Sequence, residues 1–224
     1  VLFRSGKGAW VWDVQDKKYL DFLSGLAVCN LGHAHPDIVE AIHEQASQLM
    51  HTSNLYYIEN QVQLAEQLIQ LSFPGKAFFC NSGAEANEGA LKLCRRYGNS
   101  RSASKNKILT LEKSFHGRTL ATITLTGQPI FHQGFEPMVP GIQYIPINDE
   151  KALESHFDDD VCGIFVEVIQ GESGVHPCSQ EYLTKIRQLC DKHDAVMVID
   201  EVQTGIGRTG KMFGYQHFPD LQPD

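Results

Sequence analysis

The chain has 224 residues, of which 42% are hydrophobic and 21% charged, and its formal net charge is −8. This is the composition of a globular protein that buries a core without disulfide or metal crosslinks. The acidic excess argues against a nucleic-acid partner, and the longest apolar run, residues 161–169, is far shorter than the roughly 20 residues of a membrane-spanning helix.

The cysteines and the chain ends give two further expectations. The six cysteines include no CxxC pair, which indicates buried thiols in a reducing compartment, so we expect a cytoplasmic protein. The chain starts at Val1 rather than Met and stops at Pro223-Asp224, and we expect both ends to be cut rather than natural.

The first part of the chain predicts a hairpin and two helices. Residues 9–12 and 18–22 are short strand candidates on either side of a polar turn, the pattern of a β-hairpin. Apolar residues then recur at helical spacing over residues 36–50 and again over residues 62–69. Both stretches are predicted to be amphipathic helices.

Strands and helices are predicted to alternate in the rest of the chain. Four apolar runs are predicted strands: residues 77–80, 108–111, 161–169 and 195–199. Helices are predicted over residues 84–97, with Gly98 as the C-terminal cap, and over residues 182–190 behind a Ser179 cap, whereas residues 120–125 fit either a helix or a strand. This alternation indicates an α/β fold with a mainly parallel sheet.

Polar residues follow several of these strands, where ligands bind in open α/β sheets. Ser82 and Gly83 come after the first strand and open a helix, whose free N–H groups suit a phosphate; Ser82 as a plain N-cap is the alternative. Asp200 and Glu201 follow the last strand. A buried Asp200 carboxylate needs a cationic or N–H partner, and a structural salt bridge or helix cap is the alternative.

Two further segments carry candidate residues. Glu167 lies within an apolar run and Glu172 follows it closely, although a solvated turn would also explain Glu172. Phe115 and Arg118 lie in a loop that contains Gly117. An Arg there suits a carboxylate ligand, although a surface Arg is the commoner case.

Two motifs are set aside. Residues 205–210 match GxGxxG, but they do not directly follow a strand and no helical pattern follows them, so a loop is favoured over a dinucleotide site of an oxidoreductase. His33 and His35 have no second pair of ligands at metal-binding spacing, and we interpret them as turn residues. No metal is expected.

Four motifs in order resemble the class III aminotransferases, a family of pyridoxal-phosphate enzymes with the aspartate-aminotransferase fold: residues 81–88, 115–118, 167–172 and 200–210. The resemblance runs over essentially the whole chain. It implies the fold type I architecture, with residues 1–32 as an N-terminal segment of the small domain and residues 33–224 as an incomplete large domain. It also implies a homodimer.

The resemblance assigns cofactor contacts to the residues above. Beside Ser82, the backbone N–H groups of Gly83 and Ala84 would bind the phosphate of pyridoxal 5′-phosphate. Asp200 would keep the pyridine nitrogen protonated, so that the ring can accept electrons. Phe115 would stack on one ring face.

The remaining roles are also implied by the resemblance. Val202 would pack on the other ring face, and Gln203 would reach the ring hydroxyl. Arg118 would bind the α-carboxylate of an amino-acid or 2-oxo-acid substrate. Glu172 would pair with an Arg outside this chain, and Glu167 would support a neighbouring Gln.

The substrate and the catalytic lysine complete these expectations. Within the family, the chain is most similar to members that move the terminal amino group of N-acetylornithine to 2-oxoglutarate, with succinylornithine and ornithine as alternatives. Leu26, where ornithine-specific members place a Tyr, favours the acylated amine. The catalytic Lys is expected beyond Asp224, so this portion alone is expected to be inactive. A truncated remnant that only binds or dimerises is the alternative of another class.

Overall fold

The computed structural model describes residues 1–224, which divide into two compact units, residues 1–70 and 71–224. Each unit is described by itself. The domain boundary expected after residue 32 remains a prediction. No helix is long and apolar enough to cross a membrane.

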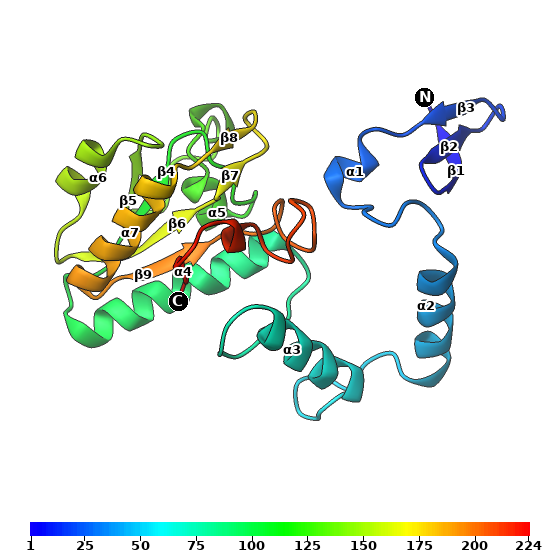
Figure 1. Cartoon of the computed structure of the whole chain (residues 1–224), viewed down its shortest axis with the longest axis horizontal. Coiled ribbons are helices and arrows are strands. Elements are labelled where there is room, and N and C mark those ends of the chain that lie inside the picture. Colours follow the sequence, from blue (N-terminus) through cyan, green and yellow to red (C-terminus); the bar gives the residue numbers. More distant parts are fainter. The chain divides into compact units, whose positions relative to one another are not determined.

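The first unit holds a small antiparallel sheet and three helices (Figure 1). Strands β1 (Phe3–Lys7), β2 (Trp10–Asp13) and β3 (Lys18–Leu20) pair in chain order, so the expected hairpin is confirmed and β1 extends it. The helices are α1 (Ser24–Ala27), α2 (Pro36–Gln48) and α3 (Glu59–Leu71), the last two of which confirm the predictions from helical spacing.

Asp21 and His33 join the sheet end to the loop before α2. The His33 Nε2 lies 2.7 Å from Asp21 Oδ2, and the backbone of Gly8 pairs with that of His33. His33 therefore has a structural partner, and no group of three or more His, Cys, Asp or Glu side chains could hold a metal ion.

The second unit is built on a parallel sheet with the order β5-β4-β6-β9. These strands are β5 (Ile142–Ile145), β4 (Lys107–Leu111), β6 (Val161–Val166) and β9 (Val196–Ile199). A separate two-stranded ribbon joins β7 (Ile169–Gln170) to β8 (His176–Pro177). The apolar run at residues 161–169 is thus divided between two strands: β6 in the parallel sheet ends at Val166, and Ile169 belongs to β7.

Helices cover both faces of this sheet because side chains alternate along each strand (Figure 1). Leu109 and Ile164 face the core formed with α6 (Glu150–His156) and α7 (Gln180–His193). Ile108 and Phe165 face the opposite core, formed with α4 (Gly83–Arg101) and α5 (Leu120–Leu125). The predicted α/β fold with a mainly parallel sheet is confirmed, and residues 120–125 are a helix.

Two expectations about local structure are wrong. Residues 77–80 form no strand, because they pair with no other segment, and Phe78 is exposed. Gly98 is not a helix cap, because α4 continues to Arg101 and ends at Ser102. A Cβ at Gly98 would lie 2.1 Å from the Lys105 carbonyl oxygen and 2.5 Å from the Cys162 Cβ. Close packing, rather than helix termination, requires this glycine.

Candidate functional site

A cavity of about 300 Å³ lies at the carboxyl ends of strands β6 and β9. The residues that line it come from the start of α4, the loop after β4 and the segments after the two strands: Gly83, Ala84, Asn87, Phe115, His116, Gly117, Arg118, Glu167, Asp200, Val202 and Gln203. The structure thus brings most of the residues singled out in the sequence to one cavity. Ser82 and Glu172 are not part of its lining.

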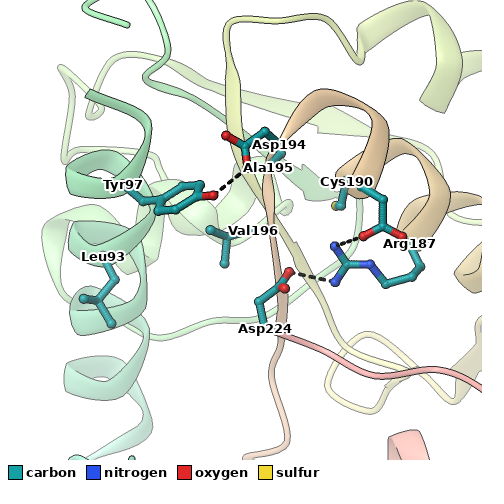
Figure 2. Close-up of a pocket in the computed structure, with 9 residues that line it drawn as sticks. Leu93, Tyr97, Arg187, Cys190, Asp194, Ala195, Val196 and Asp224 are labelled. Atoms are coloured by element: carbon teal, nitrogen blue, oxygen red, sulfur yellow. Dashed lines mark hydrogen bonds and ion pairs between the residues drawn. The ribbon is translucent and has the colours of Figure 1, made fainter. Parts of the chain in front are cut away.

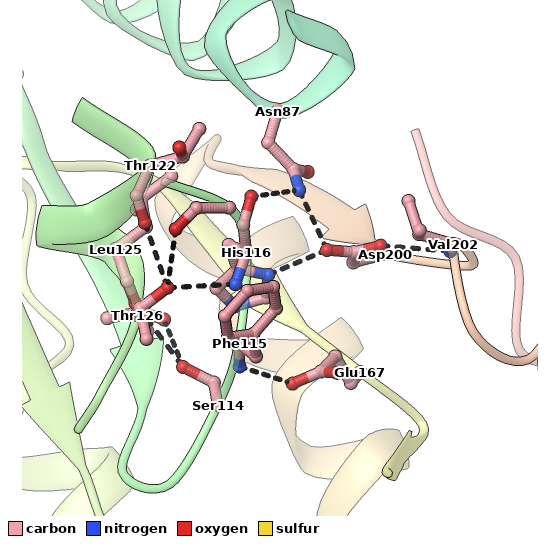
Figure 3. A network of polar contacts seen from close by, with 12 residues as sticks. Asn87, Ser114, Phe115, His116, Thr122, Leu125, Thr126, Glu167, Asp200 and Val202 are labelled. Carbon is pink, nitrogen blue, oxygen red and sulfur yellow. Dashed lines mark hydrogen bonds and ion pairs between the residues drawn. The ribbon is translucent and has the colours of Figure 1, made fainter. Parts of the chain in front are cut away.

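Asp200 is the centre of a buried polar network (Figure 3). Its Oδ2 atom lies 2.8 Å from His116 Nδ1 and accepts a 2.8 Å hydrogen bond from Asn87 Nδ2. Its Oδ1 atom accepts the Val202 N–H at 3.0 Å. The expectation that this carboxylate has a cationic or N–H partner is confirmed, because His116, Asn87 and Val202 all contact it.

The network keeps Asp200 ionised. Burial by itself would raise its pKa, but the His116 hydrogen bond and charge, with the bonds from Val202 and Asn87, outweigh burial and hold the pKa below its ordinary value. An ionised carboxylate only accepts hydrogen bonds, so the hydrogen on Nδ1 of His116 points at Asp200. The result is a negative charge fixed in a site that is shielded from water.

His116 and Asn87 are functional candidates that the sequence did not single out. Both lie inside motifs that carried the family resemblance, and that was the only available signal. Asn87 also donates to the His116 carbonyl oxygen at 2.9 Å, so it ties α4 to the loop and to Asp200 at once. The other ring nitrogen of His116, Nε2, is buried without a hydrogen-bond partner, and the ring contacts the edge of Phe165.

Glu167 is the second buried carboxyl of the cavity, with 3% of its surface exposed. Its Oε2 atom accepts the backbone N–H of Phe115 at 2.9 Å, which fixes the loop that carries Phe115 and Arg118. Burial raises its pKa to about 7, although the His116 ring and the Phe115 N–H act in the opposite direction. The two acids of the cavity therefore have pKa values displaced in opposite directions.

The start of α4 has the geometry of an anion site. Ser82 Oγ accepts the Glu85 N–H at 3.2 Å, so Ser82 is the N-cap, as one of the two readings of this motif predicted. The N–H groups of Gly83 and Ala84, in the first turn, donate to no acceptor in the chain. These two donors lie at the positive end of a 19-residue helix and on the cavity wall, so they remain available to an anionic group.

Gly117 brings the Phe115–Arg118 loop against this helix start. A Cβ at Gly117 would lie 2.8 Å from the Ala84 Cβ and 2.6 Å from Thr122 Oγ1, and its φ of +131° is one that side chains rarely adopt. The guanidinium of Arg118 lies over the ring of Phe131 at 4.5 Å and over that of Phe115 at 5.6 Å. Arg118 is therefore close to the predicted ring-stacking residue.

The remaining predicted residues lie nearby in the structure. The Glu172 carboxylate accepts a 2.6 Å hydrogen bond from Gln128, whose amide also donates to the Ser114 carbonyl oxygen. Residues 205–210 form turns, in agreement with the interpretation of the GxGxxG match as a loop. Glu201 anchors the segment that follows, because it accepts the Gly214 and Tyr215 N–H groups, both at 2.8 Å.

A larger cavity, of about 530 Å³, lies between α4, α7 and β9 (Figure 2). Its charged groups are already paired within the chain. Arg187 binds Asp191 and Asp224, and Tyr97 donates to Asp194. The smaller cavity instead holds the buried Asp200 carboxylate beside backbone N–H groups with no acceptor in the chain, so chemistry rather than size favours it as the functional site.

Comparisons with known proteins agree with this geometry. The profile of the family described as aminotransferase class-III matches residues 1–224. The chain belongs to the class III aminotransferases. Members of this family use pyridoxal 5′-phosphate as their cofactor.

Two curated relatives are both acetylornithine aminotransferases. The protein from Caldanaerobacter subterraneus is 51% identical, and the match covers 99% of this chain and 57% of the relative. The protein from Synechocystis is 49% identical, and the match covers 100% of this chain and 54% of the relative. The chain thus spans about half the length of the curated relatives it matches.

Solved structures confirm the fold. N-acetylornithine aminotransferase from Stenotrophomonas maltophilia is 42% identical with a TM-score of 0.86, and the match covers 100% of this chain and 56% of that one. Ornithine aminotransferase from Toxoplasma gondii is 31% identical with a TM-score of 0.93, and the match covers 100% of this chain and 54% of that one. A second structure of that enzyme is described with pyridoxal phosphate partly occupying its active site.

Proposed function

We propose that this chain forms the cofactor pocket of an aminotransferase that moves the terminal amino group of N-acetylornithine to 2-oxoglutarate, a step of arginine biosynthesis. One observation carries the proposal. A single cavity joins a buried, ionised Asp200 to free N–H groups at the start of a long helix. Those two features, a fixed negative charge and an anion site, suit the two ends of pyridoxal 5′-phosphate.

The residues of the cavity fit the cofactor by their chemistry. The N–H groups of Gly83 and Ala84 would bind the phosphate, with Ser82 holding the helix start. Asp200 would accept a hydrogen bond from the protonated pyridine nitrogen. The cofactor supplies an electron sink for the carbanion formed when a proton leaves the substrate. A carboxylate that stays ionised keeps that nitrogen protonated, which is what Asp200, Asn87 and His116 accomplish together.

Other side chains would cover and orient the bound groups. Phe115 and Val202 would pack against the ring faces and exclude water, and Gln203 would reach the ring hydroxyl. Arg118 would bind a substrate carboxylate through two N–H groups. Glu172 would pair with an Arg from outside the chain, and Glu167 would support a neighbouring Gln as well as the Phe115 N–H that it already accepts.

We propose that the catalytic lysine lies outside residues 1–224. None of the residues that line the cavity is a lysine, although the chain contains twelve. An aminotransferase of this kind needs a lysine amine beside the cofactor to bind it covalently and to move the substrate proton. Residues 1–224 alone would then be inactive, which agrees with the share of the relatives' length that the chain covers.

Substrate, assembly and compartment follow as parts of the same proposal. The names of the curated relatives support N-acetylornithine as the donor over ornithine or succinylornithine. A homodimer is supported by apolar side chains exposed on α2, among them Ile42. The free thiols of all six cysteines support a cytoplasmic location.

Assays with the complete protein test the proposal. We expect transfer of the amino group to 2-oxoglutarate with kcat/KM highest for N-acetylornithine, compared with succinylornithine and ornithine. Borohydride reduction with pyridoxal phosphate should attach the cofactor to a lysine outside residues 1–224, as located by peptide mass mapping. A preference for ornithine would refute the substrate. The absence of both transfer and adduct would favour a protein that only binds or dimerises.

A further inference from the structure

The backbone on both sides of Arg118 is fixed to the protein. On one side, Gly117 packs against Ala84 at the start of α4. On the other, Thr119 Oγ1 donates to Glu88 Oε1 at 2.6 Å, and the Thr119 N–H donates to Thr122 Oγ1 at 3.1 Å. The Arg118 Cα therefore has one position, and only its long side chain remains to be oriented.

Aromatic rings, rather than acids, hold that side chain. The guanidinium carbon lies 4.5 Å from the centre of the Phe131 ring and 5.6 Å from that of the Phe115 ring. No carboxylate forms an ion pair with Arg118. A ring binds a guanidinium through its flat face. The N–H groups at the edge of Arg118 consequently stay free for a ligand, which an ion pair with Asp or Glu would prevent.

Phe131 is itself well placed to support this arrangement. It ends the short helix η1 (Pro129–Phe131), and its N–H donates to the Gln128 carbonyl oxygen at 3.0 Å. Its ring meets the Phe115 ring edge-on, at 5.8 Å between centres and 80° between planes. One side chain thus contacts both the proposed ring-stacking residue and the proposed carboxylate-binding residue.

We infer that Phe131 is a positioning residue for substrate binding: its ring holds the Arg118 guanidinium at the mouth of the cavity with the N–H edge free for a substrate carboxylate. This inference rests on the proposed function. Phe131 touches no reacting atom, so its loss should weaken the binding of carboxylates far more than it slows the chemical step. From the strength of a cation–π contact at a partly exposed site, we expect the dissociation constant of a carboxylate ligand to rise by about three- to tenfold when the ring is removed.

The test uses the complete protein loaded with pyridoxal phosphate and a probe that cannot react, glutarate. Calorimetric titration should give a glutarate Kd about three- to tenfold higher for Phe131→Leu, with the KM for 2-oxoglutarate raised by the same factor and kcat changed less than about twofold. Phe131→Tyr, which keeps the ring, should bind as the wild type does. Ile130→Ala, an exposed neighbour on η1, is the matched control and should change neither constant.

A double variant separates positioning from general damage. In an Arg118→Ala background, Phe131→Leu should weaken glutarate binding no further, because the ring would have no guanidinium to hold. If Phe131→Leu does not fold, Phe131→Met keeps apolar bulk without a ring and takes its place. If the wild type binds glutarate and Phe131→Leu, or its substitute Phe131→Met, binds it with the same Kd, the inference about Phe131 is overturned and the proposed function is not. The same holds if the substitution weakens binding as much in the Arg118→Ala background as in the wild type. Failure of the wild type to bind glutarate would overturn the proposed function as well.

Discussion

The Nδ1 atom of His116 lies 2.8 Å from Oδ2 of Asp200, and both side chains are almost completely buried. A buried carboxylate would ordinarily take up a proton, but the hydrogen bonds from His116, Asn87 and Val202 reverse that tendency. Asp200 is therefore held as an anion in the cavity where the family's cofactor is proposed to bind.

Removing this charge tests the role of Asp200. We expect Asp200→Asn, which keeps the shape of the side chain, to lower turnover of the complete enzyme by about 100-fold or more, because the amide cannot hold a proton on the pyridine nitrogen. The exposed Asp160→Asn is the matched control and should retain full turnover. Steady-state kinetics measure the turnover of both variants, and thermal unfolding shows whether either substitution destabilises the fold. Near-normal turnover of Asp200→Asn would refute the assignment.

His116 should act through Asp200. In His116→Leu the carboxylate loses its principal hydrogen-bond donor, so the Asp200 pKa should rise and the acidic limb of the pH–activity profile should move to higher pH, with about 10- to 100-fold lower kcat. His116→Asn can place an amide N–H near the position of Nδ1 and should recover much of the loss. Identical pH profiles for the wild type and His116→Leu would show that the contact is only structural.

Glu167 makes stability depend on pH in a defined window. Its folded-state pKa of about 7 lies above its ordinary 4.5, so the unfolded chain loses this proton first as the pH rises. The stabilisation associated with the proton is complete below about pH 4.5 and is lost as the pH rises through 7. Glu167→Gln keeps an acceptor for the Phe115 N–H but does not titrate.

The matched measurement is urea unfolding of the wild type and Glu167→Gln between pH 4.5 and 8. The unfolding free energy of the wild type should fall relative to that of the variant as the pH rises, by roughly 3 kcal/mol between pH 4.5 and 8. Each pKa unit corresponds to about 1.4 kcal/mol. A constant difference between the two proteins would mean that Glu167 has an ordinary pKa in the folded state.

Gly98 and Gly89 give a paired test of packing in α4. Gly98→Ala should lower the unfolding free energy by about 2 kcal/mol or more, because its methyl group would overlap the Lys105 carbonyl and the Cys162 side chain. Gly89→Ala lies in the same helix with only an ordinary 3.6 Å contact to Phe78 and should stabilise the protein by up to about 1 kcal/mol. Equal effects in denaturant titrations would contradict the close packing at Gly98.

The sequence predicted the elements whose signal is local. Long apolar runs such as residues 161–169 identified buried strands, and helical spacing identified α2, α3, α4 and α7. The short elements β5 and α6 were not predicted, since four to seven residues carry little periodicity. Residues 77–80 have the composition of a strand, but a strand also requires a hydrogen-bonded neighbour, which these residues lack.

The site likewise combines residues with a local signal in the sequence and contacts between distant segments that have none. Asp200 was predictable because an acid directly after a buried strand is costly and must have partners. Its actual partner His116 lies 84 positions away in the chain, and no sequence pattern reports that the two meet. Gly98 was misinterpreted for a related reason: the groups that pack against it, the Lys105 carbonyl and the Cys162 side chain on β6, lie outside its own helix.

A crystal structure of the complete protein purified with pyridoxal 5′-phosphate tests the central claim most directly. The account predicts phosphate oxygens within hydrogen-bond distance of the Gly83 and Ala84 N–H groups, and the pyridine nitrogen within hydrogen-bond distance of the Asp200 carboxylate, with His116 still bound to that carboxylate. A cofactor bound elsewhere, or one whose pyridine nitrogen points away from Asp200, would contradict it.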